Sequence, residues 1–278
     1  MTAAPPRVVV HETARAFLDR AEPWLLRAEA EHSLVLGIAA RLAATDRPAP
    51  ALFATVEDAG GVAGVALRTP PHKLVLSRMP AAALPLVADA AEPFGVLPAV
   101  LGPPATAEAF GRVWAGRHGV EARPGMRQRV FELTRLVPPR PAEGHARPTR
   151  AADLQTVAGW LAAFEAETGA GRSDARARAE EWVRDGDAWL WDHGGPVSMA
   201  AAVARSPTGA RVGAVYTPAP LRGRGYGTAV VAALSGRLLA GGLRFCSLYT
   251  DLANPTSNAI YRRLGYAPVA DALDVEFG

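Results

Sequence analysis

The sequence predicts an α+β protein built from two domains of similar size. The first observation is a proline-rich segment without hydrophobic periodicity, residues 136–144, which lies near the midpoint of the 278-residue chain and is typical of a linker. The second is the order of patterns after it, in which two helices and three strands precede a helix, a strand, a helix and a strand. The third is a weaker copy of this order in the first half. We therefore expect domains over residues 1–140 and 146–278.

The elements of the second half follow from hydrophobic spacing and turn residues. Thr149 can cap the first helix, whose apolar residues recur on one face of a 3.6-residue period: Leu154, Val157, Leu161 and Phe164. Apolar runs on both sides of an Asp-His-Gly-Gly turn predict a hairpin. After the first helix we expect a helix at 174–184, strands at 188–191, 196–204 and 211–216, a helix at 229–239, a strand at 243–250, a helix at 256–264 and a strand at 272–277.

The first half shows the same hairpin and the same later elements. Gly61 in its hairpin turn and Gly195 in the second hairpin are separated by almost half the chain. The expected elements are strands at 52–56, 62–67 and 73–79, a helix at 80–91, a strand at 97–101, a helix at 106–117 and a strand at 130–136. An internal duplication is the simplest explanation of this repetition.

The composition is that of a globular protein from a reducing compartment. Of the residues, 49% are hydrophobic and 21% are charged, and the single cysteine, Cys246, allows no intramolecular disulfide, which is typical of the cytoplasm. The start of the chain lacks a signal-peptide pattern, and the longest apolar stretch, 33–40, is shorter than the ~20 residues of a membrane span. The net charge of +3 comes without a polybasic run, so we expect neither membrane nor nucleic acid as a partner.

A glycine-rich turn between a strand and a helix carries the strongest chemical signal. Its sequence is Arg222-Gly223-Arg224-Gly225-Tyr226-Gly227-Thr228. Alternate glycines let backbone N–H groups converge at a helix N-terminus, where the macrodipole favours an anion, so a pyrophosphate fits there. The absence of GxxxxGK[ST] excludes a P-loop, and the spacing GxGxG in place of GxGxxG argues against a dinucleotide fold.

Two spaced motifs make the second half resemble the GCN5-related N-acetyltransferase (GNAT) superfamily. The acetyl-CoA motif of that family, [R/Q]xxGx[G/A] after a strand and Thr-Pro, matches Arg222, Gly225 and Gly227. An asparagine followed seven residues later by a tyrosine, and then by a glycine–aromatic pair, matches Asn254, Tyr261, Gly265 and Tyr266. The resemblance covers residues 146–278 and reaches the first half only in outline. It implies two GNAT-like domains, each a mixed, mostly antiparallel sheet flanked by helices, the acyl-CoA N-acyltransferase fold.

The resemblance implies acetyl-CoA as a co-substrate. The amides of the glycine-rich turn would hold its pyrophosphate with added charge from Arg222 and Arg224, and the preceding strand would offer backbone groups to the pantetheine arm and the thioester carbonyl. Asn254 would bind the pantetheine, a role compatible with that of a helix N-cap before Pro255. The implied cofactor-binding residues are Val215, Tyr216, Thr217, Arg222, Gly223, Arg224, Gly225, Tyr226, Gly227, Thr228, Asn254, Asn258 and Tyr261.

The resemblance also implies catalytic roles. Tyr261 is similar to the general acid of the family, which protonates the CoA thiolate as it leaves, and a tyrosine that only packs against its helix is the alternative. Many members carry a glutamate on the strand before the glycine turn, but residues 211–216 contain no acid. Glu165 and Glu167 lie where the family places its acceptor-binding loop, and Glu167 is the residue assigned as base. Solvated carboxylates at a helix end are the alternative for both.

The expected function is acetyl transfer from acetyl-CoA to a primary amine by direct attack in a ternary complex. Cys246 is disfavoured as an acyl carrier because it lies within a strand, and no histidine pair indicates a metal. The acceptor stays open among small metabolites, antibiotics, peptides and protein N-termini. A non-catalytic acyl-CoA-binding or regulatory module is the alternative function, and a nicotinamide or flavin oxidoreductase would need a GxGxxG motif.

The first domain is expected to be degenerate. Its third strand is followed by Pro80 without a glycine-rich turn. Trp114 stands where Tyr261 stands in the second domain, and Ala107 occupies the position of the asparagine. We therefore expect the chemistry to reside in the second domain alone.

Overall fold

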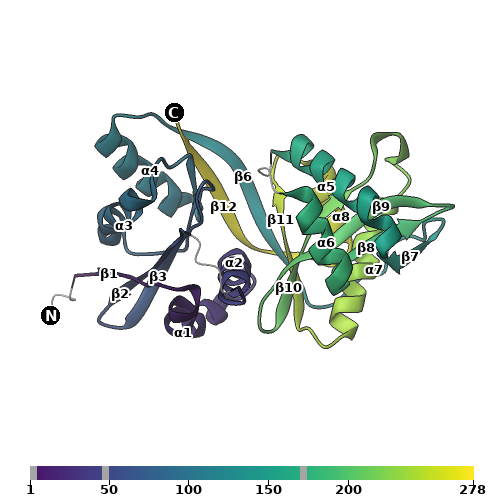
Figure 1. Ribbon diagram of the computed structural model, residues 1–278, viewed down its shortest axis with the longest axis horizontal. Coiled ribbons are helices and arrows are strands. Elements are labelled where there is room, and N and C mark those ends of the chain that lie inside the picture. Colours follow the sequence, from purple (N-terminus) through teal and green to yellow (C-terminus); the bar gives the residue numbers. More distant parts are fainter. Residues whose placement is uncertain (1–4, 46–49, 170–173) are drawn as a thin grey trace. The chain divides into compact units, whose positions relative to one another are not determined.

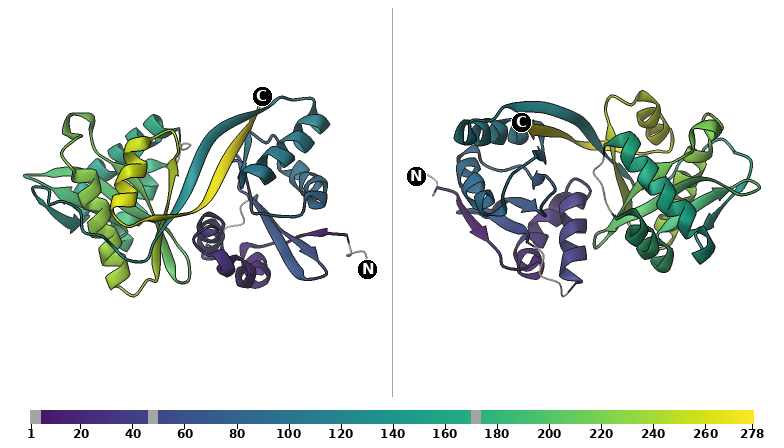
Figure 2. Two further views of the ribbon diagram at one scale, coloured as in Figure 1. Left: turned by 180° about the vertical axis from the view of Figure 1, so that it is seen from behind. Right: turned by 45° about the horizontal axis from the view of Figure 1, so that its top comes forward.

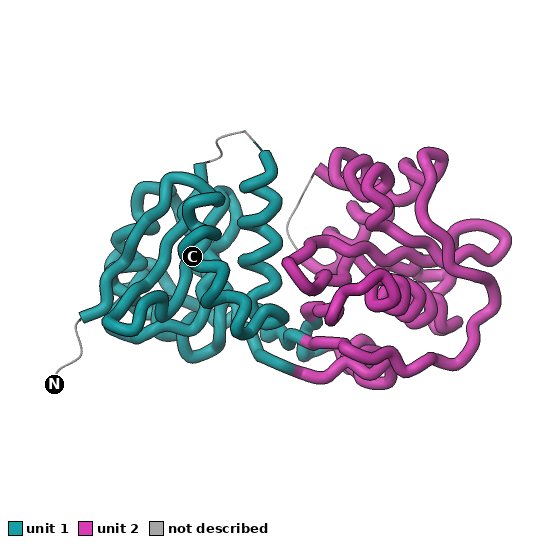
Figure 3. The backbone as a smooth tube through the Cα atoms, turned by 90° about the horizontal axis from the view of Figure 1, so that it is seen from below, with its two compact units in different colours: residues 1–130, 250–253, 269–278 teal, residues 131–249, 254–268 magenta. Residues whose placement is uncertain are grey.

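The computed structural model describes residues 5–45, 50–169 and 174–278 (Figure 1). The chain divides into two compact units, of which unit 1 comprises residues 1–130, 250–253 and 269–278, and unit 2 comprises residues 131–249 and 254–268 (Figure 3). Each unit combines a mixed sheet with packed helices. The predicted α+β fold class is therefore confirmed.

Unit 1 contains the elements of the first half. They are β1 (Arg7–Val10), α1 (Ala14–Leu25), α2 (Ser33–Ala43), β2 (Leu52–Asp58), β3 (Gly61–Arg68), β4 (Leu74–Leu76), α3 (Leu84–Ala91), β5 (Ala99–Gly102), α4 (Pro104–His118) and β6 (Ala122–Leu133). The strand order is β1-β2-β3-β4-β5-β12-β6, in which β12 (Ala267–Phe277) comes from the end of the chain. The pairs β1–β2, β2–β3, β3–β4 and β5–β12 are antiparallel, and β4–β5 is parallel.

Unit 2 contains the elements of the second half. They are β7 (His145–Pro148), α5 (Leu154–Thr168), α6 (Ala175–Asp185), β8 (Ala188–Asp192), β9 (Pro196–Arg205), β10 (Gly209–Tyr216), α7 (Tyr226–Ala240), β11 (Phe245–Asp251) and α8 (Pro255–Arg263). The strand order is β6-β11-β10-β9-β8-β7. The pairs β7–β8, β8–β9 and β9–β10 are antiparallel, and β10–β11 is parallel.

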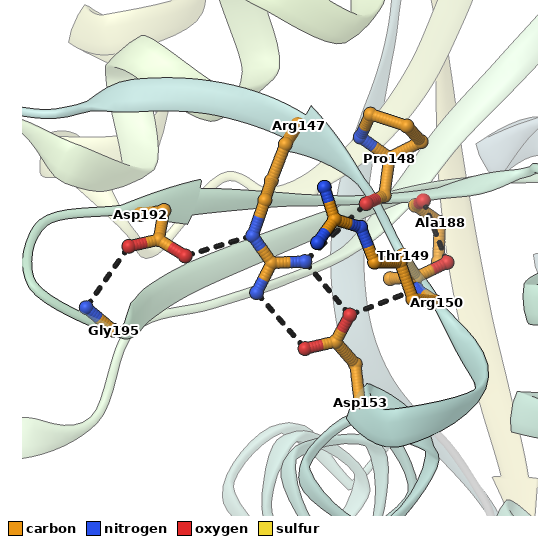
Figure 4. Close-up of polar contacts among 8 residues, drawn as sticks. All are labelled: Arg147, Pro148, Thr149, Arg150, Asp153, Ala188, Asp192 and Gly195. Carbon is orange, nitrogen blue, oxygen red and sulfur yellow. Dashed lines mark hydrogen bonds and ion pairs between the residues drawn. The ribbon is translucent and has the colours of Figure 1, made fainter.

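Strand β7 is an element that hydrophobic spacing did not predict, and it changes the role of Thr149. The Thr149 hydroxyl donates to the carbonyl of Ala188 at 3.1 Å instead of capping a helix. Helix α5 follows a single 3₁₀ turn whose start is closed by Asp153, which accepts from the backbone N–H of Arg150 at 2.8 Å. Arg147 joins this carboxylate to that of Asp192, at 2.7 Å from each, and so ties β7 to the hairpin turn (Figure 4).

Strands β6 and β12 both have residues in the two units. Residues 122–130 of β6 and 269–277 of β12 belong to unit 1, whereas residues 131–133 and 267–268 belong to unit 2. The end of β12 joins unit 1 because its backbone pairs with β5, with Leu273 opposite Gly102 and Glu276 opposite Ala99. The compact units are thus not two continuous segments, and independent folding of residues 1–140 and 146–278 stays a prediction.

In unit 2, apolar groups cover both faces of the sheet. One group joins Val230 and Leu234 of α7 to β10, β11 and the end of β6. The other joins α5 and α6, through residues such as Leu161 and Trp182, to β8, β9 and β10. Helices lie against the sheet of unit 2 in both views of Figure 2. These two groups fix the face to which each β10 and β11 side chain points.

Among the helices of the described residues, none is long and apolar enough to span a bilayer.

Candidate active site

The glycine-rich turn joins β10 to α7 through backbone conformations that favour glycine. Gly223 and Gly225 have φ values of +79° and +83°. A Cβ on Gly227 would lie 3.3 Å from the Thr217 Oγ1, so this glycine allows the start of α7 to lie close to the end of β10. Helix α7 begins at Tyr226 with Gly225 as its N-cap, earlier than apolar spacing indicated, because the turn and not the first apolar residue sets its start.

The turn presents a row of backbone N–H groups that have no protein acceptor. In the part of the chain that the structure describes, no backbone amide from Gly223 to Thr228 donates a hydrogen bond to another residue. The first intrahelical bond of α7 runs from the N–H of Ala229 to the carbonyl of Gly225 at 3.0 Å. Free donors at a helix N-terminus, together with the helix dipole, favour phosphate oxygens. The turn therefore fits a pyrophosphate.

The two arginines of the turn differ in their partners. Arg222 donates to a carboxylate oxygen of Glu167 at 2.6 Å and to the Thr217 carbonyl at 2.9 Å, and its guanidinium lies 5.8 Å from the ring centre of Tyr216. The Tyr216 hydroxyl donates to the other oxygen of Glu167 at 3.4 Å. Arg224 is exposed and makes no ion pair with the described residues. Arg224 is therefore the more available charge for an anion.

Strands β10 and β11 pair only over their first residues. The parallel register joins residues 209–211 to residues 245–247, and none of the described residues continues it. Further along β10, the register with β9 shifts between Gly213 and Tyr216, and Ala214 in this bulge has a φ of +48°, which is unfavourable for a residue other than glycine. The bulge places Val215 against the α7 core. The end of β10 thus has a backbone edge without a partner in β11.

Asn254 and Asn258 lie at the start of α8. Asn254 is its N-cap, because its side-chain oxygen accepts from the N–H of Ser257 at 3.0 Å. Its side-chain N–H₂ keeps its donors for a ligand, so capping and cofactor binding are compatible. Asn258 is buried and donates to the Asn254 carbonyl at 2.7 Å, which holds the first turn of the helix together.

Tyr261 lies one helical turn further along α8 with its ring partly buried. The ring packs at 6.5 Å from Phe131 and, edge-on, at 5.8 Å from Tyr266, in the apolar group that also contacts Val215. Burial raises the pKa of the Tyr261 hydroxyl to about 12, so the phenol is protonated at neutral pH. The fold thus brings Tyr261 and the unpaired end of β10 to one apolar group.

Two side-chain contacts that the sequence did not indicate support this region. The hydroxyl of Ser198, on β9, lies 3.0 Å from the Tyr216 carbonyl and 2.8 Å from the Thr217 hydroxyl, and so holds the end of β10. The Tyr226 hydroxyl lies 2.7 Å from the Nδ1 of His193, in the hairpin turn. The Tyr226 hydroxyl is therefore already hydrogen-bonded, so Tyr226 can offer a ligand at the turn only its backbone N–H. Nothing in the sequence indicated this role for Ser198, because it is a single serine within an apolar strand.

Other candidate chemistry lies outside this region. Cys246 is buried, and burial raises the pKa of its thiol to about 12, so a reactive thiolate is unavailable at neutral pH. An open groove in unit 1 is lined by residues that include His11 and Glu57, and by none of the predicted site residues. Hydrogen bonds from Arg20 and Arg7 lower the pKa of Glu57 to about 2. Within the described residues, no group of three or more His, Cys, Asp or Glu side chains could hold a metal ion.

One known protein family matches part of this chain in sequence. Residues 191–273 match the family described as FR47-like protein, and this segment contains the glycine-rich turn and all of α8. No curated protein matches the chain in sequence. The match covers less than a third of the chain and lies almost wholly in unit 2.

Solved structures resemble the chain over almost its whole length. A GNAT-family acetyltransferase from Colwellia psychrerythraea aligns with 98% of this chain and 100% of its own, at 14% identity and a TM-score of 0.62. A GCN5-related N-acetyltransferase from Sphaerobacter thermophilus aligns with 99% of this chain and 96% of its own, at 19% identity and a TM-score of 0.63. A tandem GNAT protein from the clavulanic acid biosynthesis pathway aligns with 97% of both chains, at 15% identity and a TM-score of 0.55. These likenesses confirm the predicted fold.

Proposed function

We propose that this chain, which has the fold of the GCN5-related N-acetyltransferases, transfers an acetyl group from acetyl-CoA to a primary amine by direct attack in a ternary complex. The observation that carries the proposal is the row of backbone N–H groups from Gly223 to Thr228, which donate to no described residue, beside the end of β10 that does not pair with β11. A phosphate-bearing ligand held at that turn has an extended backbone edge along which its arm can lie. The acceptor is a small-molecule or peptide amine.

The residues present fit acetyl-CoA. The N–H groups of the turn and Arg224 would hold the pyrophosphate, and backbone groups of Val215, Tyr216 and Thr217 would bind the pantetheine arm. Asn254 would donate to the same arm through its side-chain N–H₂. Bound in this way, acetyl-CoA supplies an acetyl group already activated as a thioester.

Tyr261 is the proposed proton donor. Its phenol is protonated at neutral pH, whereas a CoA-type thiol has a pKa of about 8.5 and leaves as the thiolate. Donation to the departing sulfur stabilises charge that develops only during the reaction. Glu167 is the proposed base, and its ion pair with Arg222 places it beside the glycine-rich turn.

Replacing Glu167 by Gln tests the proposed base. A carboxamide accepts no proton, so we expect kcat to fall about 100-fold. Steady-state kinetics on Glu167→Gln measure this, and Glu165→Gln, which changes the other candidate two positions earlier, is the matched variant. If kcat is unchanged and only the KM for acetyl-CoA rises, Glu167 serves to anchor Arg222 and is not the base.

The proposed function itself is tested by release of the CoA thiol. The protein is mixed with acetyl-CoA and a panel of primary amines, and thiol release and product mass are followed. Cys246 is buried and adds little thiol signal. We expect amine-dependent release together with an acetylated product. Tight binding of acetyl-CoA without release for any amine would instead indicate the non-catalytic alternative, an acyl-CoA-binding or regulatory module.

A further inference from the structure

Arg211 on β10 is partly buried and has no acidic partner among the described residues. Its Nε is buried and makes no hydrogen bond with any described residue. The guanidinium lies 5.9 Å from the ring centre of Tyr249, and the charge of Arg178 adds to burial in lowering the pKa of Arg211. None of the ion pairs of the described residues includes Arg211. A buried N–H donor without an acceptor is costly, and a ligand that accepts from the Arg211 Nε would remove this cost.

Arg68 in unit 1 shows how a structural arginine is satisfied in this protein. Arg68 is fully buried and has no acidic partner among the described residues, yet its guanidinium donates to four backbone carbonyls, those of His72, Phe94, Gly95 and Val96. These bonds close the loop before β5. Arg211 has no such set of acceptors, so its charge serves no comparable structural purpose.

The position of Arg211 is where β10 and β11 separate. Arg211 is opposite Ser247, in the last residue pair of the parallel register. Side chains alternate along a strand, and Ala210, Val212, Cys246 and Leu248 all pack toward α7. Arg211 and Ser247 therefore both point to the other face, the face covered by α5 and α6.

Ser247 adds a second unsatisfied group at the same place. Its hydroxyl is fully buried and has no hydrogen-bond partner in the described part of the chain. Buried hydroxyls are normally hydrogen-bonded. The Arg211 Nε and the Ser247 hydroxyl lie on residues that face each other in the register, and neither has a hydrogen-bond partner among the described residues. A guanidinium and a hydroxyl in this arrangement match the planar oxygens of a carboxylate.

We infer that Arg211 and Ser247 bind a carboxylate on the acyl acceptor, so that the substrate is an amine that also bears a negative charge. This inference rests on the proposed function. The cofactor turn follows the open end of β10, and the arm runs along the unpaired edge toward the point where the strands meet. A carboxylate held at that point directs the amine of the same molecule toward the thioester. Arg211 is thus a specificity-determining residue.

Matched pairs of acceptors test the inference. Each pair contains a primary amine with a carboxylate and the same amine with a carboxamide: β-alanine and its amide, γ-aminobutyrate and its amide, and L-alanine and its amide. We expect the wild-type protein to prefer at least one carboxylate by about 10- to 100-fold in kcat/KM, the range of charge-assisted hydrogen bonds. In Arg211→Met this preference is lost while the Kd for acetyl-CoA is unchanged, and Arg211→Lys keeps part of it.

The thermal midpoint of unfolding separates ligand binding from a structural role of Arg211. A structural role predicts a lower midpoint when Arg211 is replaced. Arg211→Met removes an uncompensated charge, so its thermal midpoint is expected to be no lower than that of the wild type. Arg68→Met leaves four carbonyls unpaired and is expected to lower the midpoint. Arg184→Met, which removes an exposed arginine of α6, controls for the loss of one charge and is expected to keep the preference.

The same experiments distinguish an error in this inference from an error in the proposed function. Acetylation of carboxylates and carboxamides at equal rates supports the proposed function and overturns the inference. If no amine is acetylated, binding of γ-aminobutyrate to the protein loaded with CoA tests the inference instead. A rise in thermal midpoint with γ-aminobutyrate that disappears in Arg211→Met supports it. The absence of any such rise, or its persistence in Arg211→Met, overturns it.

Discussion

Valine at position 225 or 227 is expected to weaken acetyl-CoA binding by roughly 100-fold or more, the equivalent of losing two or more charge-assisted hydrogen bonds. Gly225 has a φ of +83°, which a β-branched residue rarely adopts, so Gly225→Val reorients the N–H groups of the turn. At position 227 a Cβ would already lie 3.3 Å from the Thr217 Oγ1, and the valine methyl groups extend into the space at the helix start.

The Kd for acetyl-CoA, measured by calorimetry at several salt concentrations, checks this prediction. Because phosphate binding is ionic, wild-type affinity is expected to fall as salt rises. Gly186→Val is the matched control, since Gly186 ends α6 with a φ of +72° and has open space around it. That variant has the same backbone strain and is expected to bind normally. Wild-type Kd values in both folded turn variants would remove the glycine-rich turn from the cofactor site.

Replacing Tyr261 by Phe is expected to lower kcat by about 100- to 10,000-fold while leaving the Kd for acetyl-CoA near the wild-type value. The substitution keeps the ring that packs against Phe131 and Tyr266 and removes only the hydroxyl. Loss of kcat with unchanged binding is the pattern of an interaction made mainly in the transition state.

The pH dependence follows from the raised pKa of Tyr261. Because this pKa is about 12, the hydroxyl carries its proton below that value, and loss of the donor begins only as the pH approaches it. The wild-type kcat is therefore expected to show no alkaline decline due to Tyr261 between pH 7 and 10. Rates and thermal midpoints are measured on the same preparation. An unchanged kcat with a lowered midpoint, where chemistry limits turnover, would assign Tyr261 to packing alone.

Local patterns were sufficient to predict most helices and strands of unit 2, including those on either side of the glycine-rich turn. The hairpin turn, the glycine-rich turn and the start of α8 are each specified by residues that are close in sequence. Gly225 requires a positive φ, and Asn254 caps the helix that Pro255 begins. Such signals depend on short-range geometry, so a single sequence contains them. The predicted start of the helix after the turn was too late because the glycine-rich turn, and not the first residue of the apolar repeat, sets where α7 begins.

Long-range pairing decided what those patterns left open. The last strand joins unit 1 because its backbone hydrogen-bonds to β5, and hydrophobic alternation in β12 is the same whichever sheet receives it. Ala214 has a positive φ, which the sequence did not indicate because the residue is not a glycine. Arg222 meets Glu167, 55 positions earlier in the chain, whereas the Nε of Arg211 has no acceptor among the described residues. The sequence by itself therefore determined the glycine-rich turn and the helix that follows it. Only the tertiary structure decided which charges are paired, because charge pairing depends on contacts between residues far apart in the chain.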